Sequence, residues 1–365
     1  MKEKRNDFFE LKVNRIHQET EDCQTIEFEI PEELKEEFSY LPGQYLTFKF
    51  DLDGKELRRS YSLCSAQSDN IWRVAIKKVE DGRFSNYIHS NLKEGDTLSV
   101  MSPRGNFTPK YDAENNHLLA FAAGSGITPI LSIIKNTLEK EENAKFTLVY
   151  GNKRRNSIIF KEELEALKNK YMDRFTMHHI FSREQTDTPL FYGRINKEKV
   201  QTITSKLIPL SSVSEVFICG PEEMIHELKD YFIDEMGWSI GKVHFELFRS
   251  PDQPQQVSKE WIERQAKIDP SKESALTIKL DGNHFEMPAT YGGASILDTG
   301  IDNGLNLPFA CKGGVCSTCK AKLIEGEVDM AVNYALEPDE IENNFILTCQ
   351  AHPRSEKVVV DFDAK

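Results

Sequence analysis

The sequence predicts a multidomain protein: an antiparallel β-barrel, then an α/β domain with a parallel sheet, then a small α+β domain. Three observations support this order. Short alternating strands separated by turns fill the first third, apolar strands alternate with amphipathic helices in the middle third, and a cysteine-rich loop lies near the C-terminal end. The length of 365 residues also exceeds what one compact core accommodates.

Composition narrows the class of protein. The formal net charge of −13 argues against nucleic acid or an anionic membrane as the main partner. No apolar run of about twenty residues predicts a membrane span, and the charged start Met1–Asp7 predicts no secretory signal. Seven cysteines without such a signal fit a reducing compartment. We therefore expect a cytoplasmic protein with neither a nucleic-acid nor a membrane partner.

The first domain, residues 1–112, is predicted from alternating runs with turn signals such as Pro42-Gly43 between them. The expected strands are Leu11–Ile16, Thr25–Ile30, Tyr45–Phe50, Ile71–Lys78 and Thr97–Met101. An R-S-Y-S run, Arg59–Ser62, lies within this pattern. Gly82–Ile88 opens an expected helix over Ser85–Asn91, and a helix N-terminus with unpaired N–H groups is a natural phosphate site.

The second domain, residues 113–249, shows the strand–helix alternation of a parallel sheet. The expected strands are His117–Ala122, Lys145–Tyr150, Phe175–Phe181, Glu215–Cys219 and Lys242–Phe248, and the expected helices are Pro129–Leu138, Ile159–Lys170, Lys197–Leu207 and Glu222–Met236. The turn after the first strand holds Gly124 and Gly126, which let a backbone approach a pyrophosphate at the helix N-terminus. Pro129 suits the first helical turn.

A polar, proline-containing stretch, residues 250–273, predicts a linker with a short helix near Trp261. The last domain, residues 274–365, begins with an expected hairpin and holds a helix over Ser295–Asn303 and a final strand over Lys357–Phe362. It carries 14 acidic and 7 basic side chains, a net charge of −7. This charge predicts either a docking face for a basic partner or ordinary solubilising charge. The acidic run before the last cysteine consists of Glu337, Asp339, Glu340 and Glu342.

Four cysteines of this domain follow the plant-type ferredoxin spacing. Cys311, Cys316 and Cys319 form C-x4-C-x2-C, and Cys349 is a distant fourth; four such thiolates ligate a [2Fe-2S] cluster. Between the first two cysteines, Gly313-Gly314 suits a loop that wraps around the cluster, because glycine can adopt positive φ and let the backbone approach closely. The alternatives are a zinc site, which usually pairs two C-x2–4-C units, and disulfides, which the odd cysteine count disfavours.

In this order, the motifs resemble the ferredoxin–NADP reductase superfamily joined to a plant-type ferredoxin, a β-grasp fold. The matching motifs are R-x-Y-S at Arg59–Ser62, V-K-x(n)-G-x-x-S at Ile76, Lys77 and Ser85, G-x-G-x-x-P at Gly124–Pro129, and C-G-P-x-x-M at Cys219–Met224. The domain order is similar to that of reductase components of bacterial multicomponent oxygenases. Within that group, the chain is most similar to reductase subunits of phenylacetyl-CoA epoxidases.

The resemblance implies FAD, with FMN as the alternative, and a role for each matching residue on the flavin side. Arg59 would neutralise a flavin phosphate, Tyr61 would stack on the isoalloxazine, and Ser62 would lie near flavin N5. The other implied cofactor-binding residues of the two domains are Ser60, Ile76, Lys77, Phe84, Ser85, Asn86, Gly124, Gly126, Thr128, Pro129 and Gly220.

For the dinucleotide, the resemblance implies NADPH, with NADH as the alternative. Ser182 and Arg183 would hold the 2′-phosphate, an oxyanion that suits a guanidinium. Cys219 would lie beside the nicotinamide, with Glu246 close to it and Phe248 covering the flavin ring; an ordinary core phenylalanine is the alternative for Phe248.

The implied function is electron transfer from NADPH to FAD, to the [2Fe-2S] cluster and to an oxygenase or epoxidase component. One alternative is a reductase that serves another acceptor, such as a ring-hydroxylating oxygenase or a desaturase. The other is a non-catalytic redox sensor that uses the cluster as a switch. The intact flavin and nicotinamide motifs favour a reductase over the sensor.

Overall fold

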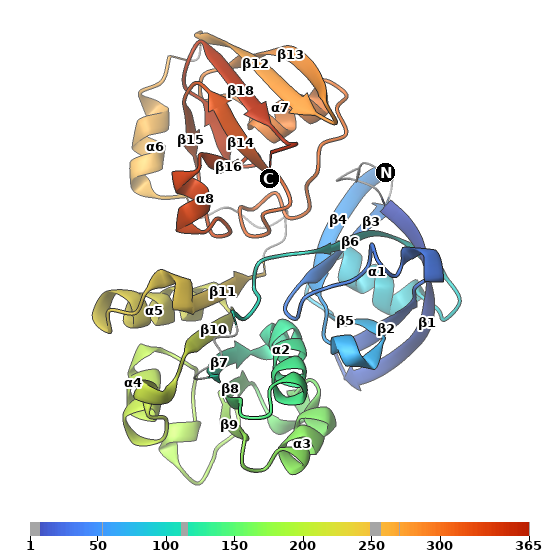
Figure 1. Ribbon diagram of the computed structural model, residues 1–365, viewed down its shortest axis with the longest axis vertical. Coiled ribbons are helices and arrows are strands. Elements are labelled where there is room, and N and C mark those ends of the chain that lie inside the picture. Colours follow the sequence, from blue (N-terminus) through green and yellow to red (C-terminus); the bar gives the residue numbers. More distant parts are fainter. Residues whose placement is uncertain (1–7, 53, 111–115, 249–256, 270, 365) are drawn as a thin grey trace. The chain divides into compact units, whose positions relative to one another are not determined.

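The computed structural model describes residues 8–52, 54–110, 116–248, 257–269 and 271–364 (Figure 1). It divides into two compact units, Phe9–Phe248 and a second that contains the C-terminal residues from Arg249 onward. No helix within the described ranges is long and apolar enough to cross a membrane.

The first domain is a six-stranded antiparallel barrel with the strand order β4–β3–β6–β1–β2–β5. Its strands are β1 Phe8–Thr20, β2 Cys23–Glu29, β3 Tyr45–Leu52, β4 Lys55–Ser62, β5 Trp72–Lys77 and β6 Thr97–Arg104. A bridge between Leu63 and Val74 joins the chain after β4 to β5 and closes the sheet. Helix α1, Arg83–Asn91, packs Phe84 and Ile88 into the barrel core. The predicted antiparallel barrel is confirmed.

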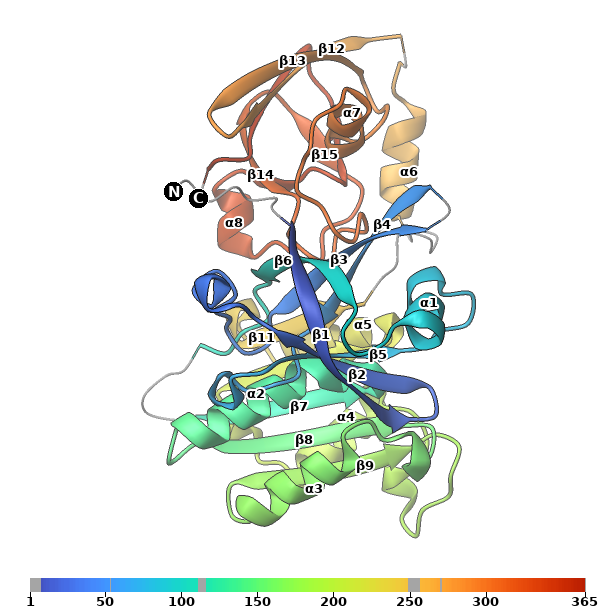
Figure 2. The same ribbon diagram turned by 90° about the vertical axis from the view of Figure 1, so that its right-hand side faces the viewer.

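The second domain is a parallel sheet with the order β11–β10–β7–β8–β9. Its elements are β7 His117–Ala123, α2 Ile127–Lys140, β8 Lys145–Asn152, α3 Lys161–Lys170, β9 Phe175–Phe181, α4 Lys197–Lys206, β10 Glu215–Gly220, α5 Glu222–Asp230 and β11 Val243–Leu247. Helices α2 and α3 cover one face, and α4 and α5 cover the other (Figures 1 and 2). The strand order reverses between β7 and β10, and ligands of open α/β sheets bind at the carboxyl ends of the strands beside such a reversal.

The expected helix Glu222–Met236 ends earlier than predicted. Regular α-helix stops at Asp230, and a π-helical turn over Tyr231–Glu235 follows. The buried aromatic pair Tyr231 and Phe232 packs in this turn, with ring centroids 5.0 Å apart. The amphipathic spacing alone does not distinguish a π-turn from continued α-helix.

An ion-pair network joins the barrel to the α/β domain. Glu163 of α3 accepts from Arg73 of β5 at 2.7 Å and from Lys135 of α2 at 2.9 Å. Lys135 also contacts Asp69, which follows β4 in the chain. The Ser132 hydroxyl of α2 donates to the backbone oxygen of Ser65 at 2.7 Å. Helix α2 therefore follows the glycine-rich turn directly in the chain and also contacts the segment that comes after the R-S-Y-S run.

The C-terminal unit contains an α+β domain with a mixed five-stranded sheet, order β13–β12–β18–β14–β16, and a small β15–β17 sheet. Its elements are β12 Glu273–Leu280, β13 Asn283–Thr290, α7 Ile296–Asp302, β14 Lys320–Glu325, β15 Val328–Met330, α8 Pro338–Glu342, β16 Phe345–Leu347, β17 Ala351–Pro353 and β18 Lys357–Asp361. Strand β12 pairs parallel to β18 and antiparallel to β13. The expected small α+β domain is confirmed.

Helix α6, Lys259–Ala266, lies in the stretch predicted as a linker, yet it packs on the C-terminal domain (Figure 2). Arg264 donates to both carboxylate oxygens of Asp329, at 3.2 and 3.0 Å, and Arg354 donates to the same carboxylate at 2.9 Å. The ring centroids of Trp261 and His352 lie 5.6 Å apart. The first part of the predicted linker, residues 250–256, lies outside the described residues.

Candidate active site

Ser62 and Glu246 meet where the end of the barrel strand β4 approaches the last strand of the α/β sheet, β11. The Ser62 hydroxyl donates to Glu246 Oε2 at 3.1 Å, and Ser62 is 2% exposed. The two residues are 184 positions apart in the chain. The structure thus brings together two of the four residues predicted to surround the reacting rings.

Cys219 lies beside this pair. It occupies β10 with no exposed surface, in register with Glu246 on one side and with Ala122 of β7 on the other. Burial, and then the nearby Glu246 carboxylate, raise the pKa of the Cys219 thiol well above its usual value, so the side chain is an uncharged thiol at neutral pH. Ser62, Cys219 and Glu246 therefore form one cluster at the reversal of strand order.

The glycine-rich turn approaches the same place. A Cβ on Gly126 would lie 2.1 Å from the backbone oxygen of Cys219, so only glycine fits there. Gly124 has φ +55°, and the Tyr150 hydroxyl donates to its carbonyl oxygen at 2.9 Å. The Thr128 hydroxyl donates to the Ser125 carbonyl at 3.0 Å. Within the described residues no side chain caps α2, although the Ile127 N–H at its start donates to the Gly124 and Ser125 carbonyls. The remaining N–H groups of the turn and of the first helical turn would be the donors for a pyrophosphate.

Two further predicted residues shape this region. Pro129 lies within the first turn of α2 and is buried. A Cβ on Gly220 would lie 3.0 Å from the Cβ of Ala123, so Gly220 allows β10 to pack closely against the end of β7. The two predicted dinucleotide motifs are therefore in direct contact.

On the barrel side, the Tyr61 ring stacks on Phe84 of α1, with centroids 5.7 Å apart and an interplanar angle of 28°. The Ser60 hydroxyl lies 3.0 Å from that of Thr47, and Arg59 donates to the backbone oxygen of Arg58 at 2.8 Å. Burial raises the pKa of the Tyr61 phenol, which keeps this ring neutral. The R-S-Y-S strand thus presents a neutral aromatic ring and a guanidinium close together.

Helix α1 begins at Arg83, two residues earlier than expected, and this changes the role of Ser85. Its hydroxyl turns inward, donating to the Gly82 carbonyl at 3.4 Å and accepting from the Val79 N–H at 3.4 Å. Phe84 is 1% exposed in the barrel core, so only its backbone is available. Asn86 Oδ1 is buried without a hydrogen-bond partner among the described residues.

Ile76 and Lys77, the predicted cofactor-binding residues at the end of β5, both contact other residues of the barrel domain. The Ile76 carbonyl lies 2.8 Å from His89 Nε2, and the Lys77 ammonium lies 3.4 Å from an Asp22 carboxylate oxygen. A phosphate at the start of α1 would therefore meet mainly backbone N–H groups. The Asn86 amide could join them as a donor, because a half-turn of this side chain exchanges the positions of its oxygen and its NH2 group. Such a set of donors suits a diphosphate.

Ser182 and Arg183 lie at the carboxyl end of β9, against the loop that follows β8. The Ser182 and Arg183 N–H groups donate to the carbonyls of Asn152 and Lys153, both at 2.9 Å. Arg183, Lys153 and Arg154 are all exposed here. The two loop cations were not predicted as site residues; the signal was the basic run Lys153–Arg155 directly after a strand.

Glu184 and Phe248 also lie at the carboxyl ends of the strands of this sheet. Glu184 accepts from Arg155 Nε at 3.1 Å and from its backbone N–H at 2.9 Å, so this third cation is already paired. Phe248, directly after β11, is 40% exposed, which distinguishes it from a core phenylalanine. Its ring is accessible to a ligand.

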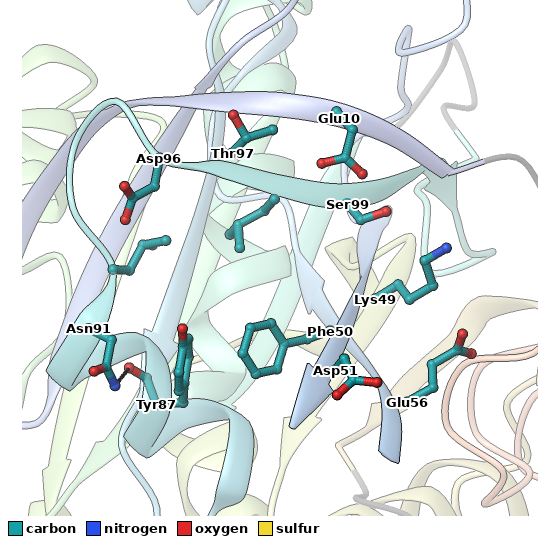
Figure 3. A pocket seen from close by; sticks show the side chains of 12 residues that line it. Glu10, Lys49, Phe50, Asp51, Glu56, Tyr87, Asn91, Asp96, Thr97 and Ser99 are labelled. Atoms are coloured by element: carbon teal, nitrogen blue, oxygen red, sulfur yellow. Dashed lines mark hydrogen bonds between the residues drawn. The ribbon is translucent and has the colours of Figure 1, made fainter. Parts of the chain in front are cut away.

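A cavity of about 540 Å³ opens on another side of the barrel (Figure 3). Phe50 and Tyr87, with ring centroids 4.3 Å apart, form its aromatic wall, and Glu10, Lys49 and Asp96 lie around it. None of the predicted cofactor residues lines this cavity. It is therefore separate from the cluster around Ser62.

The four cysteines of the C-terminal domain are free thiols, each no more than 8% exposed. The strongest interactions link Cys311 with Cys316 and Cys319 with Cys349, and Cys349 also interacts with Cys311 and Cys316. The hydrogen bond from Cys311 lowers the pKa of the Cys316 thiol to about 6, and the same interaction raises the pKa of the Cys311 thiol. In the described parts of the chain, no group of three or more His, Cys, Asp or Glu side chains is arranged around one metal ion.

The two metal centres considered differ in the arrangement of ligands that they require. A tetrahedral zinc ion requires four ligands around one point, whereas a [2Fe-2S] cluster has two irons and four thiolates. Four buried thiols with the C-x4-C-x2-C spacing and a distant fourth cysteine suit the second centre. The Gly313 N–H also donates to Cys311 Sγ at 3.3 Å, the kind of contact that stabilises a thiolate.

One of the two loop glycines uses a positive φ. Gly314 has φ +75°, and the other left-handed positions of the loop are Lys312 at +48° and Ser317 at +47°. The Tyr334 N–H donates to the Gly314 carbonyl at 3.0 Å, so a distant segment helps to set this loop.

Three family models match the chain in the predicted order. They are an oxidoreductase FAD-binding domain over residues 10–109, an oxidoreductase NAD-binding domain over 121–230, and a 2Fe-2S iron–sulfur cluster binding domain over 278–354. One component of the 1,2-phenylacetyl-CoA epoxidase of Escherichia coli (strain K12) is 42% identical over 98% of each chain. The ferredoxin reductase component of 3-ketosteroid-9-alpha-monooxygenase from Rhodococcus rhodochrous is 33% identical over 96% of each.

The chain belongs to the oxygenase reductase family. This reductase uses FAD, NAD(P)H and a [2Fe-2S] cluster, and it is an electron-transfer oxidoreductase. Phthalate dioxygenase reductase has a similar solved structure, with a TM-score of 0.54 and 25% identity over 97% of this chain and 98% of that one. That protein has a modular structure for electron transfer from pyridine nucleotides to [2Fe-2S].

Proposed function

We propose that this reductase passes electrons from NADPH through FAD and the [2Fe-2S] cluster to the oxygenase component of a phenylacetyl-CoA epoxidase. The observation that carries the proposal is the 42% identity, over nearly the whole of both chains, to a component of such an epoxidase. Bound FAD supplies the step from a two-electron donor to single electrons, and the cluster carries those electrons one at a time. The chain supplies binding, orientation and electrostatics.

At the flavin, the proposed roles follow from the contacts around Ser62. Glu246 accepts the hydrogen bond of the Ser62 hydroxyl and so fixes its rotation, which would leave the hydroxyl oxygen as the atom that faces the N5 position of a bound flavin. Cys219 is a fully buried, uncharged thiol beside Glu246, so it would add no negative charge next to a bound nicotinamide. Phe248 would cover a bound flavin ring with its exposed side chain.

For the dinucleotide, we assign the pyrophosphate to the Gly124–Pro129 turn and the 2′-phosphate to Ser182 and Arg183. Arg183 is supported by Lys153 and Arg154, which are exposed on the adjoining loop. A phosphate dianion favours several cations around it. Within the described residues, neither Arg183 nor the two loop cations Lys153 and Arg154 form an ion pair with a carboxylate, whereas Arg155 does. This arrangement supports NADPH over NADH.

The four cluster ligands are proposed to be Cys311, Cys316, Cys319 and Cys349, on the basis of their burial and pairing. The net charge of −13 supports the further proposal that neither nucleic acid nor an anionic membrane is a partner. Seven free cysteines support a cytoplasmic location.

The acidic run of the cluster domain is proposed as the docking face for the oxygenase. Its residues differ in availability: Glu340 caps α8 through the Glu337 N–H at 2.9 Å and pairs with Lys320. Asp339 and Glu342 form no ion pair with the described residues, and Ile341 between them is 45% exposed. Reversing Asp339 and Glu342 to Lys should slow electron delivery to the oxygenase, and most strongly below roughly 0.1 M salt, where charges are less screened. Turnover of NADPH with ferricyanide should stay unchanged.

Reconstitution tests the pathway. This protein, NADPH, O2 and the purified epoxidase components should turn over phenylacetyl-CoA. The second candidate, a monooxygenase that acts on another substrate, is supported by the 33% identity to the 3-ketosteroid system. Efficient turnover with that oxygenase and none with the epoxidase would keep the reductase activity and overturn the pathway assignment.

A further inference from the structure

Gln350, next to Cys349, is a polar side chain with only 1% of its surface exposed. Its side-chain nitrogen Nε2 lies 3.4 Å from Cys349 Sγ and 3.0 Å from the backbone oxygen of Lys312. Both neighbours accept hydrogen bonds, so the nitrogen, not the amide oxygen, must face them. The amide therefore uses its two N–H groups to join Cys349 to the loop that begins at Cys311.

The surroundings hold this amide in place. The Gln350 N–H donates to the Leu347 carbonyl at 2.8 Å, and the Gln350 carbonyl accepts from the Ala331 N–H at 2.9 Å. The side-chain Cγ lies 3.2 Å from where a Cβ on Gly314 would be, so the aliphatic part packs on the cysteine loop. A buried amide in such a position has no freedom to turn its N–H away from the sulfur.

We infer that Gln350 is a positioning residue that raises the reduction potential of the [2Fe-2S] cluster through its hydrogen bond to the Cys349 sulfur. Reduction adds negative charge, which the sulfur ligands share, and an N–H donor stabilises the more negative state more strongly. The same amide also links Cys349 to Lys312, and so helps to position Cys349 relative to the loop that carries Cys311, Cys316 and Cys319. This inference rests on the proposed assignment of the four cysteines as ligands.

Thr348, on the other side of Cys349, provides a matched control. It is fully buried, and its hydroxyl donates to the Cys319 carbonyl at 2.9 Å, so it bonds to backbone rather than to sulfur. Thr348→Val removes a buried hydrogen bond on the neighbouring residue. Gln350→Met keeps an unbranched side chain of similar length but removes the donor.

The experiment is a spectroelectrochemical titration of the cluster in the full-length protein. In Gln350→Met we expect the equilibrium constant for one-electron reduction of the cluster to fall about tenfold, which corresponds to a potential about 59 mV more negative. Thr348→Val should leave the equilibrium constant within about twofold of the wild-type value. An unchanged potential in Gln350→Met, or equal shifts in both variants, overturns the inference.

A second measurement needs no substitution and decides the case if Gln350→Met fails to load the cluster. Wild-type protein made with glutamine carrying 15N only in the side-chain amide should show a 15N hyperfine coupling to the reduced cluster, and absence of this coupling overturns the inference. Its failure is distinguishable from failure of the proposed function. A wild-type protein without a [2Fe-2S] spectrum would overturn the ligand assignment, whereas a loaded cluster with an unaffected potential overturns only the role of Gln350.

Discussion

The proposed preference for NADPH over NADH depends most on Arg183. Arg183→Ala should weaken NADPH binding by about 1.5–3 kcal/mol, the scale of a hydrogen bond to a charged group, and leave NADH binding unchanged. Titration of each nucleotide against the oxidised protein measures both values. Arg194→Ala, which removes an exposed arginine of the same domain, should change neither. Equal losses for NADPH and NADH in Arg183→Ala would contradict a contact with the 2′-phosphate.

At the residue scale, some features of the site could be predicted from the sequence and others could not. The four proposed ligand cysteines could be named from the sequence because thiolate chemistry and short spacing are local properties. The bond from Ser62 to Glu246 could not be predicted, because 184 positions separate them and only the packed domains bring them together. Which of the two loop glycines adopts positive φ could not be predicted either, because the φ values of this loop depend on partners such as Tyr334, which a local pattern does not contain.

A second residue-scale prediction concerns His117, which bridges Ser212 Oγ at 3.0 Å and Thr147 Oγ1 at 2.9 Å. Burial, with Lys145 nearby, lowers the pKa of this histidine. In the unfolded chain His117 is therefore protonated near pH 6.5, whereas in the folded chain it is protonated only at a lower pH. Its contribution to stability is complete above about pH 6.5 and is lost as the pH falls towards the folded pKa.

Urea unfolding at several pH values between about 7.5 and 5.5 checks this linkage. One such histidine contributes at most about 1.4 kcal/mol of unfolding free energy per pH unit, and less here because the ring is not fully buried. His117→Gln keeps a neutral polar side chain, so the variant should lose less stability on acidification than the wild type. Identical pH slopes would contradict the assignment.

At the scale of elements, the contact between α3 and the barrel depends on Glu163. Glu163→Gln leaves the cations of Arg73 and Lys135 facing an uncharged amide, and we expect the free energy of unfolding to fall by about 1.5–3 kcal/mol. Glu165→Gln is the matched control, because this side chain lies on the same helix, is 54% exposed and reaches Lys161 only at 3.8 Å. Comparable losses in both variants would show that the network adds no specific stability.

The order and type of the elements followed from periodicity, since apolar alternation and helical spacing are set by which face is buried. The early start of α1 did not follow from it. Gly82 forms the N-cap, and the helix includes Arg83 and Phe84, although the motif pointed to Ser85. The π-turn after Asp230 could not be predicted from periodicity either, because the sequence shows which residues are apolar but not how many residues complete a helical turn.

At the scale of the whole molecule, the separation into two compact units predicts independent loss of the two redox sites. Cys316→Ser should remove the iron–sulfur absorbance, while flavin binding and NADPH–ferricyanide turnover persist because their residues lie in the other unit. Cytochrome c reduction through the cluster should fall. Absorbance spectra and the two acceptor assays measure these effects together. Loss of flavin along with the cluster would contradict the division.

The packing of α6 changes where the iron–sulfur domain should be cut from the chain. A fragment that starts at residue 274, the boundary predicted from composition, discards Trp261 and Arg264. His352 then loses its contact with the Trp261 ring, and Asp329 keeps Arg354 but loses Arg264. A fragment of residues 257–365 keeps α6, and we expect it to melt at a higher temperature than 274–365 when both carry the cluster. Helix α6 therefore belongs to the folded iron–sulfur domain and not to the segment that connects this domain to the rest of the chain.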